Sequence, residues 1–419
     1  MFGRLGAVKK SSKLAYEENP EQVERAEVVV GISSCDSAAF IGHTAEQAAR
    51  GLVDYFGSKN SVIINVDSDS RDGTKEVFLG TTTKVPKIYL STPPGTKGRG
   101  HKLVNLVSKA AELRAEAVIV VDAADKSITP LWIKNLGEPI FSGFSFVTPL
   151  YLRHKYEGIL TSGIVYPLTR VLYGRRVRQP SGGDFAFGMT VAESYMHHPT
   201  GGKNAVQQAG VDVWMTTLAI NQGVPICQSY VGRPKMQGSP DGVMPHVSAF
   251  VDVVGTVFDL MGFFQERWQK VRWSKPTAVF GFGMGEPDAP PLLEVSEADL
   301  HRVFLQGFSQ YQTLWESLLD SNTFSKLTEI KNLPVAHFSL PSELWARIVF
   351  RYTVAHRNQV IDRQTLLESL LPLFHGKSLS FVKKTERMSV QQAEEYIENE
   401  CMIFEEMKSY LVADWQERQ

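Results

Sequence analysis

The sequence predicts an α/β domain with a mostly parallel sheet, followed by a C-terminal α-helical domain. Short β-branched runs alternate with segments of helical spacing from residue 26 to residue 122, and the runs are almost continuously apolar. Strands of that kind form parallel sheets that helices cover on both faces. After about residue 245 the apolar residues recur at helical spacing. The expected parts are a lead-in over 1–25, the sheet domain over 26–262, a linker over 263–292 and the helical domain over 293–419.

Four strand–helix units justify the sheet domain. The strands are expected at 26–34, 61–69, 87–92 and 116–121. The first helix, 38–57, ends on Gly57, and glycine is a frequent helix terminator. Ligands of such sheets bind beyond the carboxyl ends of the strands. The acidic clusters of this chain fall at those ends.

The helical part begins with an aromatic-rich amphipathic helix predicted at 247–273. A Pro-Gly stretch follows it and is expected to act as the linker. The remaining helices are separated by Pro-containing breaks. This domain is expected either to pack on the sheet domain or to form the contact of a homodimer.

Composition limits the classes of function. Of 419 residues, 43% are hydrophobic and 21% are charged, and Lys plus Arg (44) balance Asp plus Glu (45). No charge field indicates nucleic acid or an anionic membrane as a partner. Cys35, Cys227 and Cys401 form no CxxC pair, so neither a disulfide framework nor a zinc cluster is expected. No apolar run approaches the roughly 18 residues of a membrane span, and the N-terminus lacks the apolar centre of a signal peptide. We expect a cytoplasmic protein.

Three acids, Asp67, Asp69 and Asp72, follow the second strand. Acids in this position accept hydrogen bonds from a base or sugar, or bind a metal. The alternative is an Asx-turn and helix cap at Asp72-Gly73-Thr74. Both hold together if Asp67 stands at the strand tip while Asp72 makes the turn.

The segment 95–102, GTKGRGHK, brings glycines and cations to the start of the third helix. A helix N-terminus with free N–H groups and positive charge suits a phosphate. The spacing fits neither a Walker A motif nor GxGxxG. The alternative is a flexible surface loop.

The segment 179–184, QPSGGD, offers two glycines at which the backbone can approach a ligand, and Asp184 can accept from sugar hydroxyls. A tight turn with a capping Asp is the equal alternative.

The fourth strand runs into Asp122 and Asp125, in AVIVVDAADKS. Two carboxylates at a strand end suit Mg²⁺ or Mn²⁺. Asp125 can equally cap the helix that begins near 127–130. We therefore expect either a metal site or a cap.

Together these motifs resemble the GT-A glycosyltransferases of the glucosylglycerate synthase and mannosylglycerate synthase group, which is related to the glucosyl-3-phosphoglycerate synthases. The resemblance runs through VVVGISSCD, NVDSDSRDGT, GTKGRGHKL, VVDAADKSITPLWI and RQPSGGDFAFG. It continues in GVDVWMTTLAI, VVGTVFDLM and FEEMKSYLVADW. It covers nearly the whole chain from residue 26 and implies a Rossmann-like GT-A domain.

The resemblance also assigns site residues. The nucleotide-binding residues it implies are Gly31, Ile32, Ser33, Asp36, Asp67, Lys97 and Gly98. Asp122 would hold the metal and the donor; Asp125, which does not match the family motif, is added as the second metal-ligand candidate. Gly182 and Gly183 would line the sugar and acceptor site, to which Arg153 is added as a candidate reader of an acidic acceptor. Asp184 and Asp212 are the expected catalytic residues.

The chain departs from the family at the expected chemistry. Asp-Ala-Asp is here Asp122-Ala123-Ala124, with Asp125 one place late, and a one-residue shift on a strand points a side chain to the other face. Met236 stands where the family has a metal-binding His, and a thioether is a poor ligand for Mg²⁺ or Mn²⁺. Acceptor positions also differ, with Glu157, Ile159 and Ser162 where Asp, Thr and Asn are expected.

The expected function is transfer of a hexose, with retention, from a nucleotide sugar to a small acidic acceptor such as glycerate, giving a product of the compatible-solute class. A divalent cation, Mg²⁺ or Mn²⁺, is the expected cofactor. Lys97, Arg99 and Lys102 could carry part of its charge if the metal binds weakly. Candidate readers of an acidic acceptor are Arg153, His154, Lys155 and Arg178, which could equally form a solvated basic face. The alternative function is a degenerate homologue that binds nucleotide as a regulatory subunit.

Overall fold

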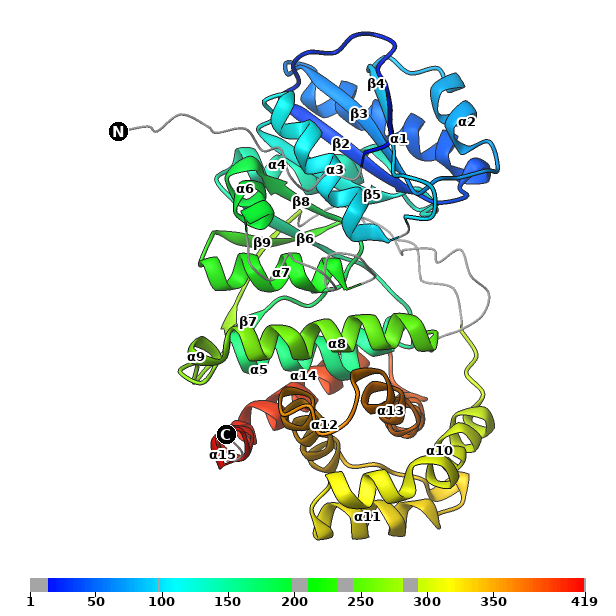
Figure 1. The fold of residues 1–419 in the computed structure, drawn as a ribbon, viewed down its shortest axis with the longest axis vertical. Coiled ribbons are helices and arrows are strands. Elements are labelled where there is room, and N and C mark those ends of the chain that lie inside the picture. Colours follow the sequence, from blue (N-terminus) through cyan, green and yellow to red (C-terminus); the bar gives the residue numbers. More distant parts are fainter. Residues whose placement is uncertain (1–13, 97, 198–209, 232–243, 282–292, 418–419) are drawn as a thin grey trace. The chain divides into compact units, whose positions relative to one another are not determined.

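The computed structural model describes residues 14–96, 98–197, 210–231, 244–281 and 293–417. The chain divides into two compact units (Figure 1). We call them the sheet unit, formed by Met1–Tyr151, Gly182–Gly238 and Ala278–Asp288, and the helical unit, formed by Leu152–Ser181, Ser239–Thr277 and Ala289–Gln419. The expected fold class, a mostly parallel α/β sheet with a helical C-terminal part, is confirmed.

The boundaries of the units differ from those expected. Residues 152–181 and 239–277 belong to the helical unit, although they were expected within the sheet domain or its linker. Residues 278–288 return to the sheet unit, because the strand at 278–280 pairs with an edge of the sheet. A local pattern reveals a helix or a strand, but it does not tell which core buries the element.

The sheet has nine strands in the order β1-β4-β3-β2-β5-β8-β6-β9-β11. Their bounds are β1 Tyr16–Glu18, β2 Val28–Ser34, β3 Ser61–Asp67, β4 Lys87–Ser91, β5 Ala117–Asp122, β6 Phe146–Leu150, β8 Phe185–Gly188, β9 Ile226–Tyr230 and β11 Ala278–Phe280. β2 to β5 are the four strands predicted from the sequence, and all four run parallel.

Strand register aligns the polar strand ends. Ser33 of β2 lies opposite Asp122 of β5, and Ser34 lies opposite Asp67 of β3. β8 runs antiparallel to both of its neighbours, and Val120 of β5 faces Phe185, the first residue of β8. Asp184, the residue before β8, therefore lies beside the carboxyl end of β5.

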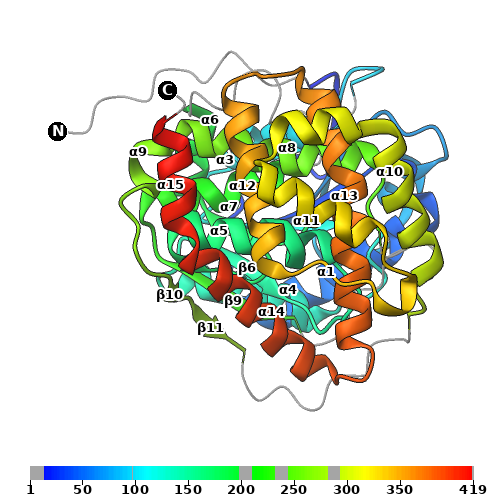
Figure 2. The same ribbon diagram turned by 90° about the horizontal axis from the view of Figure 1, so that it is seen from below.

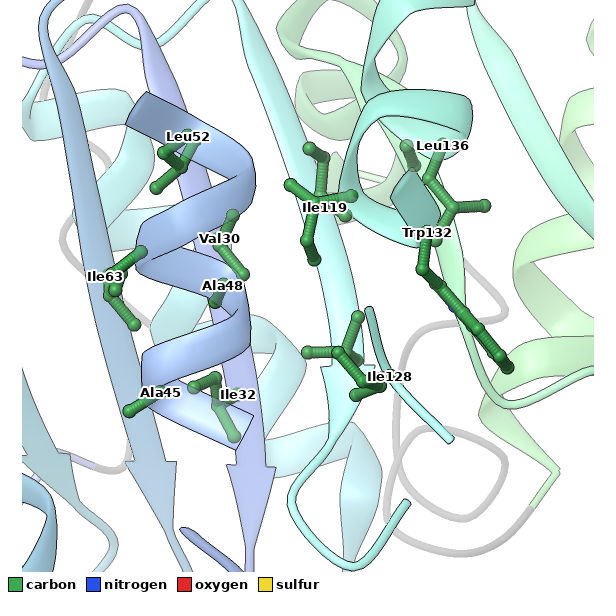
Figure 3. Close-up of a cluster of buried hydrophobic side chains, with 14 of the residues drawn as sticks. Val30, Ile32, Ala45, Ala48, Leu52, Ile63, Ile119, Ile128, Trp132 and Leu136 are labelled. Carbon is green, nitrogen blue, oxygen red and sulfur yellow. The ribbon is translucent and has the colours of Figure 1, made fainter. Parts of the chain in front are cut away.

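One face of the sheet is covered by α1 (Ala38–Phe56), α2 (Thr74–Gly80) and α4 (Pro130–Phe141). Alternate residues of β2 point to this face, as the period of a strand requires. Figure 3 shows the resulting core between α1, α4 and the strands. Its labelled members are Val30, Ile32, Ala45, Ala48, Leu52, Ile63, Ile119, Ile128, Trp132 and Leu136.

The other face carries α3 (Arg99–Glu112), and α6 (Met189–His197) packs against α3 and α7 (Val211–Gln222). Gly31 lets α3 approach β2 closely, because a Cβ at that position would lie 2.2 Å from Cδ2 of Leu106. This close contact fixes the start of α3 at the carboxyl end of the sheet.

The helical unit is a bundle in which α13 packs on α8 and α10, and α14 packs on α5 (Figure 2). Its elements are η1 Thr161–Val165, α5 Tyr166–Tyr173, α8 Val247–Phe263, α9 Gln265–Trp268, α10 Glu297–Leu318, α11 Ser321–Lys331, η3 Val335–His337, α12 Ser342–Arg357, α13 Arg363–Thr385, α14 Val390–Glu406 and α15 Lys408–Glu417. Two short strands, β7 Arg175–Arg176 and β10 Lys275–Pro276, also pair within it. The predicted helix over 247–273 ends earlier, at Phe263. Among the described residues no helix is long and apolar enough to cross a membrane.

The contact of α1 with α4 gives a stability prediction. A Cβ on Gly51 would lie 2.7 Å from Cβ of Ile133, so Gly51→Ala should overpack the interface at a cost of about 1–3 kcal/mol, offset by about 1 kcal/mol of helix propensity. We expect a lower unfolding midpoint in a thermal or denaturant melt. Gly80→Ala is the control, because among the described residues a Cβ there meets no atom within 4 Å besides those of its chain neighbours and its own helix backbone. Equal midpoints for both variants would contradict the close packing of α1 on α4.

Candidate functional site

The loops that follow β2 and β3 are hydrogen-bonded to each other. The backbone N–H of Asp36 donates to Oγ of Ser70 (2.7 Å), and the N–H of Arg71 donates to Oδ1 of Asp36 (3.1 Å). The N–H of Ser37 donates to Oγ1 of Thr74 (2.8 Å). These bonds hold the two strand tips as one polar edge.

Asp72 forms the turn that the sequence predicts. Its Oδ1 accepts from the N–H of Thr74 at 3.1 Å, which is an Asx-turn. Its Oδ2 accepts from the N–H of Ala38 at 2.8 Å, so the carboxylate caps the first turn of α1 as well. The cap on α1 joins residues far apart in sequence, and the local pattern could not reveal it.

Asp67 lies beneath this edge and is fully buried. Its Oδ1 accepts from Oγ of Ser34 (2.7 Å) and Oγ of Ser70 (2.6 Å). Its Oδ2 accepts from the N–H of Ser70 (2.8 Å) and Oη of Tyr89 (2.9 Å). The carboxylate expected to contact a nucleotide is thus bonded to four donors of the protein itself.

The other residues expected at the first strand differ in their access to ligand. Gly31 and Ile32 are buried inside β2, where they serve the packing of α3 and of the core. Ser33 is nearly buried at the strand tip. Asp36 is exposed and has a positive φ of 47°, a conformation that Asp tolerates better than most residues. Of this group, only Asp36 presents an exposed side chain at the edge.

The start of α3 brings two cations to the same end of the sheet. Lys97 lies outside the described residues, and Gly98 precedes the first helical residue. Nζ of Lys102 donates to the carbonyl of Ser34 at 3.0 Å. Burial is the larger cause that lowers the pKa of Lys102, and repulsion from the charge of Arg99 is the next.

Arg99 lies among three carboxylates. Its Nη1 is 3.5 Å from Oδ2 of Asp212 and 3.9 Å from Oδ2 of Asp122, and its Nη2 donates to the carbonyl of Gly183. Burial opposes its charge, but the carboxylates of Asp212, Asp122 and Asp184 outweigh burial and raise its pKa. We call Arg99, Asp122, Asp184 and Asp212 the Arg99 cluster.

Asp184 is the most enclosed member of the cluster. It is fully buried, and its Oδ1 accepts from the N–H of Asp122 at 3.2 Å. Oη of Tyr151 lies 2.6 Å from Oδ2 of Asp184 and 2.7 Å from the carbonyl of Gly182. Gly183 has a φ of 90°, which favours glycine, so this turn needs the residue that the sequence provides. The structure thereby brings the Gly-Gly-Asp motif to Asp122.

Asp125 has a different role from Asp122. Its Oδ1 accepts from the N–H of Ser127 at 2.9 Å, and the residue is nearly buried. It does not cap α4: Oγ1 of Thr129 does, by accepting from the N–H of Trp132 at 3.2 Å. The expectation that Asp125 caps this helix is therefore wrong, because Thr129 stands directly before it.

The residues present do not fit a divalent cation. Within the described ranges no group of three or more His, Cys, Asp or Glu side chains is arranged to hold a metal ion. Arg99 lies between Asp122 and Asp212, and one oxygen of Asp125 is engaged with Ser127. Met236, at the expected His position, is outside the described residues. His246 is exposed and precedes α8 of the helical unit.

The candidate acceptor readers lie in the helical unit. Nη1 of Arg153 donates to Oε1 of Gln179 at 3.1 Å. Arg178 pairs with both oxygens of Glu394 (2.7 and 2.8 Å) and donates to Oγ of Ser162. Three carbonyls near the end of α13 accept from Nζ of Lys155. The charges of Arg178 and Lys155 therefore stabilise the bundle and do not form a solvated face.

Two features of the site were missed by sequence reasoning. Arg99 was expected to serve a phosphate, and nothing in GTKGRGHK indicates that its partners are carboxylates at positions 122 and 212. Tyr151 directly follows β6 and carried no motif. Both depend on which strand ends become neighbours.

No protein-family model and no curated protein matches the chain. Solved structures of glucosyl-3-phosphoglycerate synthase from Mycobacterium tuberculosis are similar to it. The complex with Mg²⁺ and UDP is 18% identical, covers 56% of this chain and 78% of that chain, and has a TM-score of 0.44. The complex with Mn²⁺, UDP and glucosyl-3-phosphoglycerate is 18% identical, covers 58% and 80%, and has a TM-score of 0.43.

A third solved structure, described as a mycobacterial protein, is 19% identical, covers 57% of this chain and 74% of that chain, and has a TM-score of 0.44. All three likenesses are distant.

The hydrogen bonds of Asp67 give a second prediction. Asp67→Ala leaves the hydroxyl donors of the buried Ser34 and Tyr89 without this acceptor, and each such loss costs about 1–3 kcal/mol. The half-buried donors of Ser70 lose the same acceptor. We expect a clear fall in the unfolding midpoint of the full chain. Asp54→Ala removes an exposed carboxylate from α1 and should change stability by less than about 0.5 kcal/mol. A stable Asp67→Ala variant would show that this carboxylate does not hold the strand tips.

Proposed function

We propose that the protein is a glycosyltransferase that moves a hexose from a nucleotide sugar to a small acidic acceptor such as glycerate. The single observation that carries this proposal is the convergence of Asp36, Asp122, Asp184 and Asp212 at the carboxyl end of the parallel strands. Parallel sheets bind their ligands at this end. The motifs that supply these residues are those that resemble the glycosyltransferase group.

In this proposal the nucleotide lies along the tips of β2 and β3. Asp36 and Ser33 are the side chains that would meet the base and ribose, while Gly31 and Ile32 shape the strand beneath them. Asp67 acts through Ser70, whose N–H and hydroxyl it holds. Its contribution to nucleotide binding is therefore one of positioning.

The diphosphate is proposed to meet the N-terminus of α3. Gly98 and the following N–H groups, with Lys97 and Lys102, provide donors and positive charge there. Asp184 and Asp212 would lie at the reacting sugar, where carboxylates stabilise the positive charge that develops as the bond to the diphosphate breaks. Retention of configuration belongs to the proposal through the resemblance. We leave out a divalent cation, because the carboxylates that would bind it face Arg99.

The acceptor side of the proposal is carried by Gly182, Gly183 and Arg153. Arg153 enters the proposal through its charge in the sequence, and in the structure its Nη1 donates to Oε1 of Gln179 at 3.1 Å. Glu157 accepts from the N–H of His154, and burial raises its pKa. Glu157 is longer than the Asp expected from the family at this position, so the acceptor is proposed to differ from the family's as well. Cytoplasmic location and a homodimer remain predictions.

A second candidate function is a nucleotide-binding subunit without turnover. One observation favours it: the catalytic carboxylates of the proposal are neutralised by an internal cation. Such a protein would keep nucleotide affinity and lose transfer. Measuring binding and transfer separately distinguishes it from the enzyme.

Nucleotide binding is tested by isothermal titration of the full chain with UDP, GDP and ADP. We expect one nucleotide to bind, and Asp36→Asn to weaken its binding about fivefold, because a hydrogen bond to a charged acceptor is stronger by about 1 kcal/mol than one to a neutral acceptor. Asn keeps the loop, since it can still accept from Arg71 and tolerates the positive φ. Asp54→Asn is the control for loss of one exposed charge. No binding of any nucleotide would refute both candidate functions.

Transfer is tested with the sugar nucleotide of whichever base binds. Asp184→Asn should lower kcat about 100-fold or more, with nucleotide affinity changed by less than about threefold, because the carboxylate is proposed to act on the transition state. Tyr151→Phe removes the hydroxyl next to Asp184 and keeps the carboxylate, so we expect a smaller loss. A thermal melt checks that both variants fold. If Asp184→Asn weakens nucleotide binding in the same proportion as kcat, the catalytic role assigned to Asp184 is wrong.

A further inference from the structure

Arg99 connects three segments of the sheet unit at one point. It is the first residue of α3, and its guanidinium reaches Asp122 at the end of β5, the carbonyl of Gly183 before β8, and Asp212 in the first turn of α7. Its side chain is only 19% exposed. The cation is therefore inside the cluster and not on its rim.

The carboxylates around it need a positive charge. Asp184 is fully buried and Asp212 is 7% exposed, and an ionised carboxylate away from water is costly unless it is paired. A guanidinium stays charged at any pH of interest and donates several hydrogen bonds in one plane. One of those donors bonds to the carbonyl of Gly183, and the charge of Arg99 lies within ion-pair distance of Asp122 and Asp212.

A divalent metal and this guanidinium compete for the same oxygens. Mg²⁺ and Mn²⁺ need oxygen ligands that converge at about 2.0–2.2 Å around a compact ion. Here Oδ2 of Asp122 and Oδ2 of Asp212 both face Nη1 of Arg99, at 3.9 and 3.5 Å, so the guanidinium nitrogen takes the place next to these oxygens. Bringing a metal to Asp122 and Asp212 would require Arg99 to leave.

We propose that Arg99 is the resident cation of the Arg99 cluster and keeps divalent metal out of it. Arg99 balances the carboxylates, positions Asp122 and Asp212, and takes the place that a metal would need. The consequence for catalysis rests on the proposed function: transfer would not require added metal and would survive a chelator. The exclusion of metal itself needs no nucleotide.

The test is a titration of the full-length protein with Mn²⁺ in the absence of nucleotide. Binding is measured by calorimetry and by the broadening of the paramagnetic signal of Mn²⁺. The wild type should bind no Mn²⁺ at the cluster. Arg99→Ala should gain one Mn²⁺ site, with an affinity for Mn²⁺ at least tenfold above that of the wild-type protein. Adding Asp212→Asn to Arg99→Ala should remove this site. Arg99→Lys keeps a cation and should resemble the wild type.

Lys109→Ala is the matched control, because it also removes one positive charge from α3, where Lys109 pairs with Glu17 and Glu112. It should gain no Mn²⁺ site. If Arg99→Ala fails to fold in a thermal melt, Arg99→Gln, which retains most of the side-chain volume, takes its place.

Two results would overturn the proposal. One is Mn²⁺ binding to the wild type that disappears in Asp122→Asn. The other is a folded Arg99→Ala or Arg99→Gln protein that binds no more Mn²⁺ than Lys109→Ala. Failure of every nucleotide to bind, together with the gain of a metal site in Arg99→Ala, would refute the proposed function and leave this inference intact.

Discussion

The antiparallel position of β8 beside β5 is the constraint on which the candidate site depends. In a sheet of parallel strands, only the carboxyl ends of β2 to β5 would meet at one edge. Because β8 runs the other way, the residue that enters it, Asp184, lies next to the residue that ends β5, Asp122. The Gly-Gly turn before β8 is held there by Tyr151 and Arg99. If β8 ran parallel to β5, Asp184 would lie at the opposite edge of the sheet from Asp122.

Charge balance is the second constraint at this edge. Asp184 and Asp212 are buried, and Arg99 supplies the positive charge that makes their burial tolerable. The start of α3 can deliver that charge because Gly31 lets Leu106, and with it the helix, approach β2. A glycine in the middle of a strand thus helps to determine the position of a guanidinium about two helical turns from the contact. Packing and electrostatics are linked through one helix.

The residues carried over from the family divide into those that could meet a ligand and those that build the edge. Asp36 is exposed, whereas Asp67 is bonded to Ser34, Ser70 and Tyr89. A motif match treats both as binding residues, because spacing carries no information on burial. The same distinction applies to Lys155, which the bundle uses to satisfy carbonyls at the end of α13.

The sequence by itself determined the local structure. The β-branched runs of β2 to β5, the helices after them and the Asx-turn of Asp72 all follow from short-range pattern, and all are present. Tertiary structure decided the rest: that 152–181 and 239–277 join the helical unit, that Thr129 and not Asp125 caps α4, and that Arg99 faces carboxylates. The physical reason is that periodicity and propensity act over a few residues. Strand order, burial and ion pairing depend on which distant segments become neighbours.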